Sequence, residues 1–149
     1  MPYITPFKLY FILISSFIVL FACSEISNKE QIQNQIVRMQ QAISDKSMAD
    51  FMVYFTDDFV GNKKISKKQL RQLLFVHFRR NRNIDTYKWQ ADITVEQNLA
   101  QVEIYVFVSG SNTRLPERAR AYKINTKWQK SAGQWLVASA VWKNVEQFM

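Results

Sequence analysis

Few side chains in this sequence can act as a nucleophile, a general base or a metal ligand. Its 149 residues include a single cysteine, Cys23, and a single histidine, His77. One thiol cannot form an internal disulfide, and one thiol with one imidazole cannot build a metal site rich in Cys or His. The sequence also has no metal-ligand spacing and no glycine-rich phosphate loop. We therefore expect neither a metal nor another cofactor.

Acid–base chemistry would depend on His77 or on an aspartate. His77 lies on the apolar stripe of a helix predicted over about 67–81, where it is either a general base facing a pocket or a histidine packed at the edge of the core. Asp57 and Asp58 precede an extended segment, where Asp commonly turns the chain, and Asp92 falls opposite the apolar face of a strand. We expect no catalytic residue, because spacing assigns no acid partner to His77.

The first 22 residues have the pattern of an export signal. Lys8 is the only charged residue before an apolar run from Leu9 to Phe21, which is long enough for a secretory signal. The run is short for a membrane-spanning helix, which needs roughly 20 apolar residues. The sequence Leu20-Phe21-Ala22-Cys23 resembles a bacterial lipobox, which implies cleavage before Cys23 and attachment of lipid to its sulfur and new amino group. The alternative is an uncleaved signal anchor with a buried, inert cysteine.

This resemblance divides the chain into three parts. We expect a lipoprotein signal peptide over 1–22, a lipid-anchored tether over 23–26 and a folded domain over 27–149. Ser24 rather than Asp follows the cysteine. By the sorting rule that the resemblance implies, the protein would be exported and held on the periplasmic side of the outer membrane if the cell is Gram-negative.

Helix signals come first in the predicted domain. Ser27 and Ser47 each open a capping-box pattern, and Ser66 stands where a helix cap is expected. Apolar residues then recur at helical spacing behind each serine. The predicted helices run over about 27–44, from Ser47 through Phe55, and over about 67–81.

Strand signals follow from residue 84 onward. Apolar residues alternate on both sides of a turn at Gln97-Asn98, which places Tyr87, Trp89 and Ala91 on one face of the first strand. Two further strands are predicted over about 117–129 and 134–144. Helices followed by a run of antiparallel strands indicate an α+β domain.

The order of these elements resembles the nuclear transport factor 2-like superfamily. The passage from Phe51 to Phe59 and the terminal hairpin around Trp128 and Trp135 also carry this resemblance. It implies an α+β fold in which three N-terminal helices pack on a curved antiparallel sheet of about four long strands, forming a cone-like pocket. Members of the superfamily include ketosteroid isomerases, dehydratases, polyketide cyclases and non-catalytic binding or dimerisation domains, so the fold alone leaves the function open.

Aromatic, imidazole and guanidinium side chains are the candidates for lining such a pocket. Rings would stack on an apolar or cyclic ligand, and an arginine would bind a carboxylate or phosphate. The competing interpretations are core filling for the rings and a solvated strand end for the arginine. The candidate residues are Tyr54, His77, Trp89, Tyr105, Arg120, Tyr122, Trp128 and Trp142.

Basic residues exceed acidic residues by 20 to 12 and cluster over 63–71 and 79–82. We expect these clusters to form solvated helix surface, with attraction to an anionic membrane as a second interpretation. The export signal argues against nucleic acid as a partner.

The sequence therefore predicts an envelope lipoprotein whose non-catalytic domain binds a small apolar or anionic ligand or a partner protein. Its predicted partners are the membrane, through lipid on Cys23, and a second copy of the chain, through the sheet. Two alternatives remain: a small lyase or isomerase that uses His77 or an Asp with a Tyr, and a purely structural dimerisation module.

Overall fold

The computed structural model describes residues 26–111 and 118–145, without the side chains of Trp89, Arg118 and Ala119. The predicted signal peptide, Cys23 and the first residues of the tether lie outside the described residues. None of the helices in the described part is both long and apolar enough to cross a membrane.

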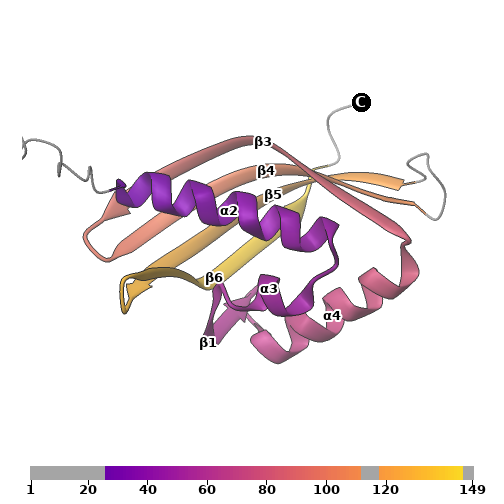
Figure 1. Ribbon diagram of the computed structural model, residues 1–149, viewed down its shortest axis with the longest axis horizontal. Coiled ribbons are helices and arrows are strands. Elements are labelled where there is room, and N and C mark those ends of the chain that lie inside the picture. Colours follow the sequence, from indigo (N-terminus) through magenta and orange to yellow (C-terminus); the bar gives the residue numbers. More distant parts are fainter. Residues whose placement is uncertain (1–25, 112–117, 146–149) are drawn as a thin grey trace, which may run out of the picture.

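The described residues form one curved sheet with helices on its concave side (Figure 1). The helices are α2 (Asn28–Ser44), α3 (Met48–Met52) and α4 (Lys67–Arg80). The strands are β1 (Phe55–Gly61), β2 (Ile65–Ser66), β3 (Asn83–Glu96), β4 (Leu99–Ser111), β5 (Arg118–Ser131) and β6 (Gln134–Asn144). The strand order is β2-β1-β6-β5-β4-β3. Helix α2 lies along the long strands, and α4 stands at one end of the molecule.

The predicted α+β class and curved sheet are confirmed, but the sheet contains more than the four predicted long strands. The short strands β1 and β2 extend it beyond β6. The four long strands β3–β6 pair antiparallel as predicted, whereas the added strand β1 runs parallel to β6. The backbone N–H of Val137 donates to Tyr54 O at 2.8 Å, which shows how the segment entering β1 covers the edge that β6 would otherwise leave open.

The second predicted helix is shorter than expected. It ends at Met52, and Phe55 begins β1 instead of closing the helix. The rings of Phe55 and Phe59 meet edge to face with centroids 4.9 Å apart, so burial of both rings favours the extended strand over another helical turn. Ser47 does not cap the helix backbone, because its hydroxyl instead donates to the Asp50 carboxylate at 2.6 Å.

Ser27 and Ser66 cap the other two helices, although only the serine half of the capping box predicted at Ser27 is present. Ser27 Oγ accepts the backbone N–H of Glu30 at 3.2 Å. Ser66 and Gln69 form a complete capping box, with both reciprocal hydrogen bonds present. These caps fix where α2 and α4 begin and therefore which side chains each helix turns toward the sheet.

A bulge in β3 overturns the predicted common face of Tyr87 and Ala91. The pairing with β4 shifts between Lys88 and Gln90, which inserts one extra residue at Trp89. Since side chains alternate along a strand, one extra residue moves everything beyond it to the opposite face. Ala91 pairs with Ile104 on the concave face, whereas Tyr87 lies on the convex face and is 64% exposed.

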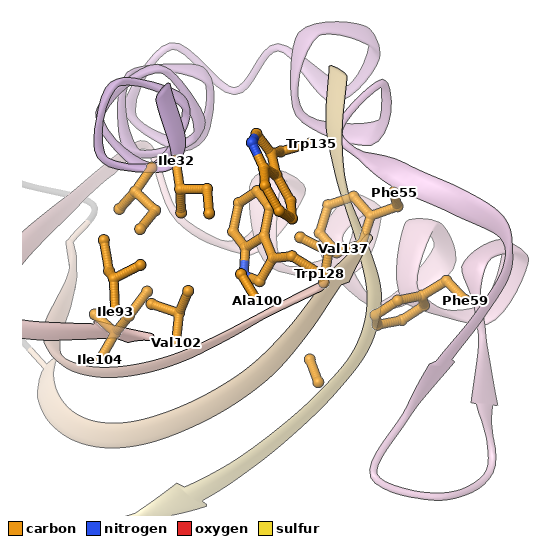
Figure 2. Close-up of a cluster of buried hydrophobic side chains, with 12 residues drawn as sticks. Ile32, Phe55, Phe59, Ile93, Ala100, Val102, Ile104, Trp128, Trp135 and Val137 are labelled. Atoms are coloured by element: carbon orange, nitrogen blue, oxygen red, sulfur yellow. The ribbon is translucent and has the colours of Figure 1, made fainter. Parts of the chain in front are cut away.

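The hydrophobic core fills one end of the space between the curved sheet and the helices, which we call the cone. Figure 2 shows its side chains between α2 and the curved strands. The largest fully buried members are Trp128, Trp135 and Phe59. The remaining members are Ile32, Ile36, Phe55, Ile93, Ala100, Val102, Ile104, Val137 and Ala140. Burial of these side chains holds α2 against the sheet near the β3–β4 and β5–β6 turns.

The buried indole N–H of Trp128 has a hydrogen-bond partner in the core. Trp128 Nε1 donates to Thr126 Oγ1 at 2.7 Å, and this hydroxyl donates to Val102 O at 3.2 Å. Thr126 is itself buried. One hydroxyl group therefore joins β4 and β5 to one of the two buried core tryptophans and satisfies the indole N–H of Trp128.

Thr126→Val should destabilise the fold while keeping the side-chain shape. It leaves the Trp128 N–H buried without an acceptor, so we expect a loss of about 1–3 kcal/mol in the free energy of unfolding. Urea unfolding monitored by tryptophan fluorescence measures this loss. Thr94→Val, at an exposed position of β3, makes the same chemical change and should cost less than about 0.5 kcal/mol. Equal losses in the two variants would contradict the role given to the Thr126 hydroxyl.

Candidate functional site

A cavity of about 910 Å³ occupies the part of the cone that the core leaves open. Its floor is the concave face of β4, β5 and β6, and its roof comes from the second half of α2, from α3 and β1, and from α4. Trp128 both belongs to the core and lines the cavity. The aromatic side chains therefore fill only one end of the cone, and a space large enough for a small molecule remains at the other end.

Most of the cavity surface is apolar. The apolar surface follows from the alternation of side chains along the strands. Ile104, Val106 and Val108 all lie on the face of β4 that lines the cavity. The facing helices contribute apolar side chains at helical spacing. They are Ile36, Met39 and Ile43 from α2, and Leu70, Leu74 and Phe78 from α4.

Polar side chains gather where α4 ends and β3 begins. Arg80 and Asn81 reach the cavity from the helix end, and His77 from its last turn. Thr86 and Arg120 both lie opposite Val108 in the paired strands, so they share this end of the floor. The cavity thus combines an apolar body with one polar end, which is the arrangement that orients an amphipathic ligand.

The charge at the polar end has a single sign. Arg80 and Arg120 line the cavity, and neither forms an ion pair with a described residue. The cavity lining within the described residues contains no Asp or Glu. An anionic group inside the cavity would therefore meet guanidinium groups and no competing carboxylate.

Thr86 carries an unsatisfied polar atom at this end. Its Oγ1 is buried and has no hydrogen-bond partner among the described residues, although Thr86 lines the cavity. Buried hydroxyl groups usually have a partner in the protein or in ordered water. Thr86 is therefore a hydrogen-bonding group that a bound molecule or a water can satisfy.

Two glycines allow close approaches that shape the cavity wall. A Cβ on Gly61 would lie 2.8 Å from Trp142 Cη2, and a Cβ on Gly110 would lie 2.6 Å from Asn81 Oδ1. Asn81 Nδ2 in turn donates to His77 O at 3.0 Å and closes the end of α4. The missing side chains thus let the Trp142 ring and the end of α4 lie directly against the strands.

Lysine side chains tie the roof together. Lys46, in the turn after α2, donates to Arg82 O at 3.0 Å and to Asn81 O at 3.4 Å. Lys67, at the start of α4, donates to Phe55 O at 2.8 Å. These bonds join the two ends of α4 to the turn after α2 and to β1, and so hold the elements of the roof together.

The structure brings together five of the eight predicted pocket residues. They are His77, Arg120, Tyr122, Trp128 and Trp142. Sequence reasoning missed Arg80, Asn81 and Thr86. Asn81 continues the apolar stripe of α4 by one helical turn, so helical spacing contained a signal for it. Helical or strand spacing contained no signal for Thr86. The bulge in β3 places Thr86 on the same face as Ala91, whereas simple alternation would place them on opposite faces.

Tyr54 and Tyr105 lie outside the cavity. Tyr54 lines a separate depression between α2 and α3 on the outside of the roof. Tyr105 alternates with Ile104 and Val106 and so faces the convex side, where Lys123 Nζ lies 5.3 Å from its ring centroid. The backbone of Trp89 forms the bulge, and its side chain is outside the described part.

An ion pair marks the convex face beside Tyr105. Lys123 Nζ donates to Glu103 Oε1 at 2.8 Å. This hydrogen bond lowers the pKa of Glu103 below its usual value and raises the pKa of Lys123. The outer side of the long strands therefore mixes aromatic rings with paired charges and differs in character from the apolar cavity floor.

The aspartates considered for acid–base chemistry lie away from the cavity. Asp57 is fully exposed and accepts a hydrogen bond from Lys67 at 2.9 Å. Asp58 is exposed, and Asp92 is exposed and accepts from Gln90 at 3.1 Å. Within the described residues, no group of three or more His, Cys, Asp and Glu side chains could hold a metal ion.

Comparison with known proteins gives structural neighbours without sequence relatives. No family model matches the sequence, and no curated protein matches it. A nuclear transport factor 2-like protein of unknown function from Pseudomonas putida is 15% identical with a TM-score of 0.69, over 83% of this chain and 99% of that chain.

Two other solved structures show the same likeness. A candidate scytalone dehydratase from Novosphingobium aromaticivorans is 12% identical with a TM-score of 0.70, over 77% of this chain and 82% of that chain. A candidate calcium/calmodulin-dependent protein kinase II association domain from Xanthomonas campestris is 9% identical with a TM-score of 0.68, over 85% and 94% of the two chains. At such identities the likeness concerns the fold alone. The chain therefore has the nuclear transport factor 2-like fold.

The contact between Gly61 and Trp142 can be tested with a double-mutant cycle. Gly61→Ala should cost about 1–3 kcal/mol, because the new Cβ would lie 2.8 Å from Trp142 Cη2. Trp142→Phe removes that part of the ring, so the alanine should cost much less in the double variant. Urea unfolding of the four proteins measures the coupling. Costs that add to within about 0.5 kcal/mol would show that the ring does not rest on Gly61.

Proposed function

We propose that this protein is a lipid-anchored envelope protein whose cone binds a small apolar molecule that carries an anionic group. The observation that carries the proposal is the cavity of about 910 Å³, which combines an apolar body with Arg80 and Arg120 and contains no carboxylate within the described lining. The apolar part of the ligand would lie over β4 and β5, and its anionic group would lie at the end of α4. Charge-assisted hydrogen bonds from guanidinium groups suit a carboxylate, sulfonate or phosphate.

The absence of a carboxylate in the described lining favours binding over catalysis. The lyase or isomerase alternative would require His77 or Tyr122 to move protons, and both line the cavity. No acidic side chain of the described lining lies there to orient the imidazole or to stabilise its protonated form, as a carboxylate beside a catalytic histidine does. The candidate scytalone dehydratase neighbour shares the fold with this chain, and at 12% identity that likeness carries no argument for its reaction.

Two fluorescent probes that differ by one sulfonate group test the proposal. The probes are 1-anilinonaphthalene-8-sulfonate and its uncharged counterpart N-phenyl-1-naphthylamine. Both should bind in the apolar cavity. Arg120→Gln should weaken binding of the sulfonate roughly tenfold or more, since a hydrogen bond to a charged group contributes about 1.5–3 kcal/mol. Binding of the uncharged probe should not change. Fluorescence titration gives both dissociation constants.

Matched variants distinguish binding in the cavity from binding at the protein surface. Arg71→Gln removes an exposed arginine of α4 that does not line the cavity, so it should leave both affinities unchanged. Val106→Trp narrows the cavity floor and should weaken both probes. Equal effects of Arg120→Gln and Arg71→Gln on the sulfonate probe would refute an anion site at Arg120.

The proposed localisation at the membrane depends on Cys23 and on the apolar run before it. Cys23→Ala in the full chain should abolish labelling by radioactive palmitate and retention of the mature domain in the membrane fraction. The physical reason is that lipid attached to Cys23 would hold the mature domain on the membrane once the apolar signal segment has been removed. Labelling of the variant at the level of the natural chain would refute the lipobox. Ser24→Ala serves as the control, because it leaves the acylated residue in place.

A further inference from the structure

Helix α4 is unusual for a helix of a small domain, because it buries none of its residues. It spans Lys67–Arg80 and includes five basic residues and no acidic residue. Three of its large apolar side chains are exposed, namely Leu73 at 44%, Phe75 at 54% and Val76 at 42%. Exposed apolar and basic side chains on one short helix indicate a surface that meets something other than bulk water.

One face of α4 lines the cavity, and the opposite face is exposed. Leu70, Leu74, His77 and Phe78 line the cavity. A helix turns 100° per residue, so Lys68, Gln72, Phe75, Val76 and Arg79 lie on the opposite side. We call these five residues the outer face of α4. Figure 1 shows the helix at the end of the molecule, and among the described residues its main neighbours are β1, β2 and α3.

The outer face places an aromatic ring among cations. The Arg79 guanidinium carbon lies 5.6 Å from the ring centroid of Phe75, which is within the range of a cation–π contact. Lys68 and Arg79 are exposed on the same face, and Lys63 and Lys64 are exposed just before the helix begins. Asp57 of β1 is paired with Lys67. The other acidic residues on the elements that pack against α4, Asp50 and Asp58, are fewer than the five basic residues of the helix. The field at this end of the molecule is therefore positive.

We propose that the outer face of α4 lies on an anionic lipid surface. Phe75 and Val76 would enter the boundary between headgroups and acyl chains, and Lys68 and Arg79 would meet lipid phosphates. This is the division of an interfacial amphipathic helix, in which apolar residues are partly inserted and basic residues face anionic headgroups. The inference is independent of the cavity ligand and of the lipid on Cys23, because the contact uses only residues of α4.

Hydrogen–deuterium exchange of the full-length protein reconstituted in vesicles tests the contact. One set of vesicles is pure phosphatidylcholine, and the other contains phosphatidylglycerol as well. We expect amide exchange in residues 68–80 to slow at least roughly fivefold on the anionic vesicles, since each basic residue at such a surface contributes about that factor. The difference should vanish at 1 M salt, where the Debye length falls to about 3 Å.

Paired charge reversals assign the effect to the outer face. The double variant Lys68→Glu and Arg79→Glu should exchange equally fast on both kinds of vesicle, and Phe75→Ser should lose most of the protection. The double variant Lys127→Glu and Lys143→Glu makes the same change in net charge at exposed positions of β5 and β6 and should keep the protection. Circular dichroism checks that each variant folds.

The proposal is overturned if the natural chain exchanges equally on the two kinds of vesicle. It is also overturned if both double variants lose protection alike, because the effect would then come from net charge alone. Protection of α4 by a single-stranded RNA oligomer at 150 mM salt, with none from anionic vesicles, would reassign the outer face to nucleic acid.

Discussion

The rest of the structure depends on how deeply Trp128 is buried and how its indole N–H is satisfied. The ring lies where the core meets the cavity, and its N–H reaches Val102 O through the Thr126 hydroxyl. These two hydrogen bonds connect β5 to β4 on the concave side of the sheet. Since burying an N–H group without an acceptor costs free energy, this hydrogen bond helps to hold the Trp128 ring, the two strands and the helix above them together. One end of the cone is thereby closed, and the opposite end stays open.

What remains at the open end follows from the alternation of side chains and from the placement of α4. The strands bring an apolar floor, and the end of α4 brings Arg80, Asn81 and His77 to the same place as Arg120. The helix is held there by lysine bonds to backbone carbonyl groups at both of its ends. Because α4 packs only its inner side against the cone, its outer side is left with exposed basic and apolar residues. The cavity and the outer face are thus two consequences of one helix position.

The sequence was informative where a local pattern decides the structure. Ser27 and Ser66 cap helices as predicted, because capping depends on residues within one turn. Tyr122, Ile124 and Thr126 alternate along β5 and all line the cavity, as the regular alternation of side chains along a strand requires. Phe55 was assigned to a helix, although it forms a strand that pairs with β6. That pairing joins residues some 80 positions apart, and a local pattern carries no information about such a partner.

The sequence by itself determined the α+β class, the long helix and strands, and three of the ring-bearing cavity residues in β5 and β6. It also contains the lipobox-like segment ending at Cys23, which predicts export and lipid attachment. Only the tertiary structure decided which end of the cone is filled and that Arg80 and Thr86 share the polar end with Arg120. It also turned Tyr87 and Tyr105 to the convex face. The physical reason is that bulges, sheet edges and the position of a helix on the sheet depend on contacts between residues far apart in the sequence. A single bulge moves every following side chain of the strand to the opposite face of the sheet.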